Sequence, residues 1–245
     1  MAAVEIGFLG SADALGSGGR LQTSFHIKTP SLQILIDCGA TSFAAMKRWG
    51  IDPSRIEMVF LSHLRGDHFA GIPFLILDGQ FSRRRTALII AGPPGVERRI
   101  RETQEVLFPC SSQGKQRFAI QYAAYHDREL FSWPAVSVLP VLHPSGSSSF
   151  ALRIATEGKI IAYSGDTEWA EALIEAAHGA DLFICEADCF DNKTKYHLDG
   201  QTIFEQRPRL NCRRLILTDM QEEMLLHRGE ISMEYAEDGK RLVLE

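Results

Sequence analysis

One stretch of sequence, Ser62-His63-Leu64-Arg65-Gly66-Asp67-His68, indicates the fold of this chain. The apolar run Met58-Val59-Phe60-Leu61 comes directly before it and predicts a buried strand. Two imidazoles and a carboxylate so close together just after a strand are typical of metal ligands. Arg65 stands among them, however, and a guanidinium only donates hydrogen bonds, so it cannot bind a metal cation. The stretch therefore indicates metal-ligand chemistry, and it leaves open whether the site is working, altered or lost.

Other ionisable residues share this placement at the C-terminal end of an apolar run. They are Asp37 after 34–36, His143 after 138–142, Asp166 after 160–163 and the pair Ser164-Gly165, and Asp219 after 215–218. Strand ends along one edge of a sheet can converge on a cleft, where proteins tend to build their sites. We therefore expect these side chains to meet the histidine stretch at one place.

Length and composition indicate a globular chain with a sizeable core. The 245 residues, 45% apolar and 23% charged, fit a single domain over 1–245. The net charge of −5 argues against broad electrostatic binding of nucleic acid, although a few local arginines can still hold a phosphate-bearing substrate. The five cysteines are scattered, so we expect reduced thiols. The N-terminus lacks signal-peptide character and no apolar stretch has membrane-spanning length, so we expect a cytoplasmic protein with no membrane partner.

Strand and helix signals alternate along the chain. We expect strands at 21–27, 32–36, 57–61, 87–91, 117–123, 135–141, 149–155, 159–163, 181–186 and 213–218, and helices at 41–49, 71–81, 96–107 and 168–178. Many strands in meander order with interspersed helices predict a β-sandwich covered by helices, not a parallel doubly wound sheet. The glycine-rich loop near residue 16 lacks G-x-G-x-x-G spacing, so a dinucleotide site is not expected.

The order of these motifs resembles the metallo-β-lactamase superfamily over essentially the whole chain. The residues that carry the resemblance are Asp37, His63-x-Arg65-x-Asp67-His68, His143 and Ser164-Gly165-Asp166. The glycine-rich loop and Tyr163-Ser164-Gly165-Asp166-Thr167 are most similar in style to its phosphodiesterase and tRNA 3′-processing branch. The resemblance implies an α+β fold, a four-layer αββα sandwich, with a two-metal site on one edge.

The resemblance also implies roles for individual residues. His63 and His143 match ligands of the first metal, Asp67 and His68 match ligands of the second, and Asp166 matches the carboxylate that bridges both. Asp37 matches the aspartate that orders the histidine loop from behind. Tyr196-His197-Leu198-Asp199 falls where this branch often carries a histidine near the scissile bond.

Two positions depart from the family pattern. Arg65 replaces the second histidine of H-x-H-x-D-H, and Asp219 stands where the last histidine ligand is expected. Like unit charges about 4 Å apart near a protein surface repel by roughly 4 kcal/mol, and a divalent ion doubles that repulsion. We therefore expect one divalent ion (Zn, Mn or Fe) to be favoured over two. Asp219 either adds an oxygen ligand to this ion or forms a salt bridge with Arg65.

Two hypotheses of function follow. In the first, the chain is a hydrolase whose metal-activated water attacks a phosphodiester or related ester. Asp67 holds the metal and orients the water, His197 protonates the leaving group, and Arg65 faces a phosphoryl oxygen in place of the first metal. In the second, the chain is a non-catalytic binding or regulatory protein whose site is closed by an Arg65–Asp219 salt bridge. We favour the hydrolase because most ligand-type residues remain. A small-molecule or phosphodiester substrate is expected, nucleic acid is possible, and a homodimer is the default assembly.

Overall fold

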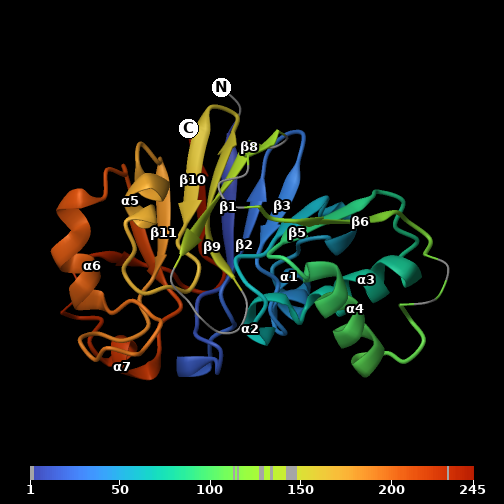
Figure 1. The fold of residues 1–245 in the computed structure, drawn as a ribbon, viewed down its shortest axis with the longest axis horizontal. Coiled ribbons are helices and arrows are strands. Elements are labelled where there is room, and N and C mark those ends of the chain that lie inside the picture. The colour runs from blue at the N-terminus through green and yellow to red at the C-terminus, as the bar shows by residue number, and fades with distance from the viewer. Residues whose placement is uncertain are drawn as a thin grey trace.

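The structure is a computed structural model that describes residues 3–112, 114, 116–126, 130–132, 135–141, 148–230 and 232–245. Two seven-stranded sheets pack face to face, and helices cover the outer face of each (Figure 1). The described residues therefore confirm the mixed architecture of two sheets between helical layers. The segment 142–147, which contains His143, lies outside the described residues.

The first sheet has the strand order β14-β1-β2-β3-β4-β5-β6. Its strands are β1 (Val4–Gly10), β2 (Ser24–Lys28), β3 (Gln33–Ile36), β4 (Met58–Phe60), β5 (Leu88–Gly92), β6 (Ile120–Ala124) and β14 (Arg241–Leu244). Neighbouring strands are antiparallel from β14 to β3 and parallel from β3 to β6. The C-terminal strand β14 thus forms one edge of this sheet, beside the N-terminal strand β1.

The second sheet has the order β13-β12-β11-β10-β9-β8-β7. Its strands are β7 (Leu130–Ser132), β8 (Ala135–Val141), β9 (Ser149–Thr156), β10 (Lys159–Tyr163), β11 (Leu182–Glu186), β12 (Leu215–Thr218) and β13 (Glu234–Tyr235). Strands β7 to β10 are antiparallel, whereas β10 to β13 are parallel. The meander order expected from the sequence therefore describes only half of each sheet, because parallel neighbours require crossover connections.

Helices fill these crossovers and cover the sheets. Those beside the first sheet are α1 (Ser42–Arg48), α2 (Gly66–Phe69), α3 (Ile72–Phe81) and α4 (Val96–Leu107), and those beside the second are α5 (Ala172–Ala177), α6 (Gly200–Gln206) and α7 (Glu222–Leu226) (Figure 1). Helix α4 illustrates the reason, which is that one face of each helix is buried against the protein. Its buried residues are Val96, Ile100 and Gln104, and its charged residues lie on the opposite, solvent-facing side. Among the described residues, no helix has both the length and the apolar character that crossing a membrane requires.

The main core lies between the two sheets. Alternate residues of the strands face inward and form one apolar cluster that contains side chains from both sheets. Phe25 of the first sheet packs edge-on against Phe8 of the same sheet and Tyr163 of the second, with ring centroids 5.3 and 5.1 Å apart. This core fixes the two sheets against each other, so residues at the ends of their strands hold fixed positions across the sandwich.

Candidate functional site

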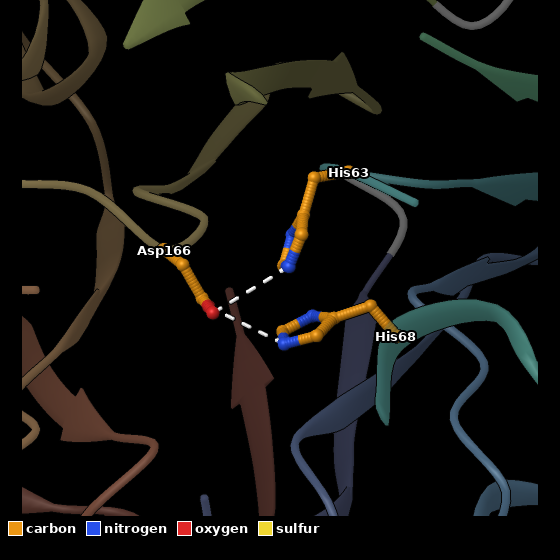
Figure 2. Close-up of side chains that lie close together, drawn as sticks. All are labelled: His63, His68 and Asp166. Carbon is orange, nitrogen blue, oxygen red and sulfur yellow. Dashed lines mark ion pairs between the residues drawn. The ribbon is translucent and has the colours of Figure 1, made fainter. Parts of the chain in front are cut away.

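Side chains from both sheets meet at one edge of the sandwich. His63 and His68 come from the loop and short helix α2 after β4, and Asp166 comes from the loop after β10. His63 Nε2 lies 3.5 Å from Asp166 Oδ2, and His68 Nε2 lies 3.3 Å from Asp166 Oδ1. Figure 2 shows both imidazole rings pointing at this carboxylate. All three side chains are buried, so an interaction among them is shielded from water.

The Asp166 carboxylate has the character of a metal ligand. It is 1% exposed, and neither oxygen accepts a hydrogen bond of good geometry from a described residue. Buried carboxylate oxygens without such bonds are costly unless a cation compensates them. Metal–nitrogen and metal–oxygen bonds of about 2.1 Å bring two ligand atoms of one ion to within about 3–4 Å of each other. The histidine nitrogens around Asp166 have this spacing, so the residues present fit a divalent ion.

Asp37 holds the histidine loop from behind. Its Oδ1 accepts a hydrogen bond of 2.7 Å from the Ser62 backbone N–H, and its Oδ2 accepts one of 2.7 Å from the Ser62 hydroxyl. The same Oδ2 lies 2.8 Å from His68 Nδ1. Because Asp37 occupies Nδ1, it orients the ring so that Nε2 is left for the cluster, as a carboxylate behind a ligand histidine does.

Two further carboxylates border the cluster. Asp67 Oδ2 lies 3.2 Å from His68 Nε2. Asp219 follows β12 with a left-handed backbone (φ 59°), and its N–H donates to the Ser11 carbonyl at 3.0 Å. Ligand atoms of Asp219, Asp166 and His197 lie within 4.8 Å of one another. The structure thus brings the expected metal ligands together, apart from His143, which lies outside the described residues.

The charges of the cluster are closely linked. Burial alone would raise the pKa of Asp166, but the imidazoles of His68 and His63 hold it well below its ordinary value. Burial alone would lower the pKa of His68, but Asp166, Asp37 and Asp67 raise it well above its ordinary value. Burial and the nearby Asp166 carboxylate raise the pKa of Asp219 well above that of an exposed aspartate. Protons thus balance the buried negative charge, and a divalent cation would replace them.

Arg65 lies against the carboxylates of the cluster. Its Nη1 is 3.7 Å from Asp166 Oδ2, and its Nε is 3.7 Å from Asp67 Oδ1. The second hypothesis required a salt bridge between Arg65 and Asp219. The ion pairs among the described residues do not include this salt bridge, so that expectation does not hold. Arg65 lies instead against Asp166 and Asp67. Burial alone would raise the pKa of Asp67, but His68 and Arg65 lower it to about 2.

His197 points into the same cluster and has a buried partner. Its Nδ1 lies 2.8 Å from Glu186 Oε2, and its Nε2 lies 3.4 Å from Arg65 Nη1. Glu186 is fully buried at the end of β11, and its other oxygen accepts a hydrogen bond from the Thr167 N–H. The sequence motifs do not single out Glu186. It ends the apolar run Leu182-Phe183-Ile184-Cys185, so the same strand-end placement that singled out Asp166 would have found it.

Comparisons with known proteins agree with this geometry. A family model described as "Anti-Pycsar protein Apyc1" matches residues 4–240. A ribonuclease Z of Methanothermobacter thermautotrophicus is 39% identical over 38% of this chain and 30% of its own length. A ribonuclease Z of Anoxybacillus flavithermus is 24% identical over 98% of this chain and 93% of its own length.

Solved structures show the same fold. The metallo-β-lactamase fold protein YhfI from Bacillus subtilis is 18% identical, with a TM-score of 0.81 and full coverage of both chains. The short form of human tRNase Z is 21% identical, with a TM-score of 0.75 and 98% coverage of both chains. A diphosphatase of the PhnP family is 16% identical, with a TM-score of 0.78 over 99% of this chain and 98% of that one. The chain therefore has the metallo-β-lactamase fold.

Proposed function

Because this chain belongs to the Anti-Pycsar protein Apyc1 family, we propose that it is a metal-dependent hydrolase that cleaves phosphodiesters with one divalent ion and one guanidinium. The observation that carries the proposal is the Asp166 carboxylate, which is buried, lacks good hydrogen bonds from described residues and faces two histidine nitrogens. Ribonuclease Z relatives and a diphosphatase of the same fold add support for phosphoester chemistry.

We assign the ion to the second of the two metal positions that the resemblance to the metallo-β-lactamase superfamily implies. Asp67, His68, Asp166 and Asp219 would hold it there, with three carboxylates and one imidazole. Such a donor set suits Mn²⁺ or Fe²⁺ as well as Zn²⁺. When bound, the ion supplies Lewis acidity, which lowers the pKa of water and polarises a phosphoryl oxygen.

Arg65 supplies the second positive charge. Its guanidinium lies 3.7 Å from Asp166 Oδ2, on the carboxylate that the family uses to bridge two metals. A guanidinium cannot activate water, but its fork of N–H donors suits two oxygens of a phosphoryl group. Arg65 therefore binds and orients the substrate and stabilises the negative charge that develops on the phosphoryl oxygens during attack.

His197 supplies the proton for the leaving group. The Glu186 carboxyl group lies 2.8 Å from Nδ1 and fixes the ring, so Nε2 faces the cluster. Arg65 can only donate to Nε2, which makes this nitrogen an acceptor in the free protein. A charged phosphoryl oxygen is a stronger acceptor than imidazole, so substrate binding draws the guanidinium away. Nε2 can then carry a proton and deliver it to the departing oxygen.

Metal analysis combined with hydrolysis of bis-p-nitrophenyl phosphate tests the proposal. After reconstitution with Mn²⁺, Fe²⁺ or Zn²⁺ and removal of excess ion, we expect about one ion per chain and a metal-dependent rate. His68→Ala should lose both the ion and the rate. His178→Ala changes an exposed histidine after α5 and should retain both.

The same measurements decide between the two hypotheses. A chain that retains no ion and shows no metal-dependent rate under any of the three metals would support the non-catalytic binding protein. Two ions per chain together with full activity would instead contradict the role given to Arg65, because the first position would then accept a metal despite the guanidinium.

A further inference from the structure

Arg20 lies outside the cluster, yet its side chain holds the backbone on both sides of Asp219. It follows the glycine-rich loop and is half-buried. Its Nη1 donates to the Ser11 carbonyl at 3.2 Å, and its Nη2 donates to the Met220 carbonyl. The same Ser11 carbonyl accepts the Asp219 N–H at 3.0 Å. One guanidinium therefore binds the acceptor of the Asp219 N–H and also the residue that follows Asp219.

The backbone of Asp219 needs such support. Its φ of 59° is left-handed, a conformation that is strained for residues other than glycine and persists where the surroundings hold it. The residues on either side are fixed to the loop after β11, since Thr218 accepts a backbone hydrogen bond of 2.8 Å from it and Gln221 donates one of 2.9 Å to it. Asp219 and Met220 lie between these two points, where the contacts of Arg20 fall.

The segment that carries the Ser11 carbonyl is fixed without Arg20. Ser11 is fully buried, and its hydroxyl donates to Asp238 Oδ1 at 2.8 Å. An isolated β-bridge between Ala12 and Met220 keeps the two segments adjacent. Substitution of Arg20 should therefore leave both segments folded and release only the Met220 carbonyl and the strained turn before it.

The position of this turn matters because Asp219 is one of the proposed metal ligands. Its carboxylate lies within 4.8 Å of ligand atoms of Asp166 and His197. A ligand binds a metal well only when residues behind it fix its orientation, and loss of such a residue typically weakens metal binding by about 10–100-fold. A guanidinium that fixes the backbone on both sides of Asp219 meets this description.

We propose that Arg20 is a positioning residue that holds Asp219 in place as a metal ligand. The inference rests on the proposed function and deepens it, because it gives a residue of the glycine-rich loop a part in metal binding. Its sign is distinctive. Loss of a positive charge near the site would by itself favour a divalent cation, so weaker metal binding after loss of Arg20 identifies positioning.

Calorimetric titration of the metal-free full chain with Mn²⁺ tests the proposal. Arg20→Gln should raise the Mn²⁺ dissociation constant by about tenfold or more. Arg20→Lys keeps the charge, but an ammonium group is a single point that cannot span two carbonyls as a guanidinium does, so the constant should rise here too, by less. Arg228→Gln is the matched control and should leave it unchanged, because Arg228 is an exposed arginine whose Nε donates to the Leu225 carbonyl at 3.0 Å.

A second pair of variants shows whether Arg20 acts through Asp219. Asp219→Gly removes the carboxylate, and glycine adopts a positive φ without strain, so Arg20 has no ligand left to position. Mn²⁺ should bind Asp219→Gly more weakly than the native chain, and the addition of Arg20→Gln should weaken binding little further. At saturating Mn²⁺, Arg20→Gln alone should hydrolyse bis-p-nitrophenyl phosphate with a kcat close to that of the native chain, because the bound ion then holds Asp219.

Three results would overturn the inference and leave the proposed function standing. The first is a folded Arg20→Gln protein that binds Mn²⁺ as tightly as the native chain or more tightly. The second is an equal effect of Arg20→Gln with and without Asp219→Gly, and the third is a low kcat that saturating Mn²⁺ does not restore. If thermal unfolding shows that Arg20→Gln is not folded, Arg20→Lys decides in the same way. A native chain that binds no ion and hydrolyses no phosphodiester would instead contradict the proposed function itself.

Discussion

Replacement of Arg65 by glutamine should change metal binding and catalysis in opposite directions. Arg65 lies 3.7 Å from an oxygen of Asp166 and 3.7 Å from an oxygen of Asp67. At an effective dielectric constant of about 20, a unit charge and a divalent ion about 4 Å apart repel by roughly 8 kcal/mol. Because 36% of the Arg65 side chain is exposed, solvent screening reduces this repulsion to about 2 kcal/mol.

The loss of about 2 kcal/mol of repulsion corresponds to about 30-fold tighter metal binding. Catalysis should fall, because the variant lacks the charge that faces the phosphoryl oxygens. The loss of one such stabilising group typically lowers kcat by about 100-fold or more. Arg65→Gln is therefore expected to bind Mn²⁺ more tightly and to hydrolyse phosphodiesters more slowly.

Calorimetric titration with Mn²⁺ and steady-state hydrolysis of bis-p-nitrophenyl phosphate measure the two effects separately. Arg98→Gln is the matched control, since Arg98 is an exposed arginine on α4 that pairs with Glu102 at 3.2 Å. It should alter neither quantity, and thermal unfolding should show that both variants are folded. A folded Arg65→Gln protein that binds Mn²⁺ no more tightly, or hydrolyses the diester as fast as the native chain, would refute the argument.

Three further substitutions test the site. The raised pKa of Asp219 favours its proton in the folded state, so its contribution to stability is present below about pH 4 and is lost as pH rises through the raised value. Metal-free Asp219→Asn should therefore unfold at a higher temperature than the native chain at neutral pH, and a lower temperature would contradict the proposed repulsion. A Cβ on Gly39 would overlap the Asp67 carbonyl, whereas a Cβ on Gly66 meets nothing. Gly39→Ala should thus lose about 2 kcal/mol or more in urea unfolding and Gly66→Ala about none; equal losses would count against this close approach. His197→Gln should slow hydrolysis of an unactivated diester about 100-fold but that of a p-nitrophenyl ester much less, and equal slowing would exclude the general-acid role.

Much of the fold could be predicted because its signals are local. Alternating apolar residues predicted strands at 135–141 and 159–163 with the bounds that the structure has, and the charged, amphipathic run 96–107 is helix α4. The parallel halves of the sheets could not be predicted from such patterns. Pairing of β1 with β14 joins Val4 to Leu244, and no local pattern specifies a partner so distant in sequence. Short helices such as α2 and α7 lack the length for a clear period.

The part of the site that could be predicted is the set of ligand-type residues whose spacing and order follow a known motif. His63, His68 and Asp166 follow strands and share a motif order, and the structure brings them together. The partners of Arg65 could not be predicted, because a long flexible side chain can reach several carboxylates and the ionisation of each decides the outcome. Glu186 could have been found by its strand-end position, but its pairing with His197 depends on a loop whose course the sequence does not specify.

The position of Arg65 also bears on how activity depends on metal supply. A guanidinium that is part of the chain cannot dissociate, be removed by a chelator or be exchanged for the wrong ion. A centre that needs two ions loses activity with the square of the free metal concentration when metal is scarce, whereas a centre that needs one loses it only in direct proportion. With Arg65 beside Asp166, one of the two cationic groups that we propose for this site belongs to the chain itself and is present as soon as the chain folds.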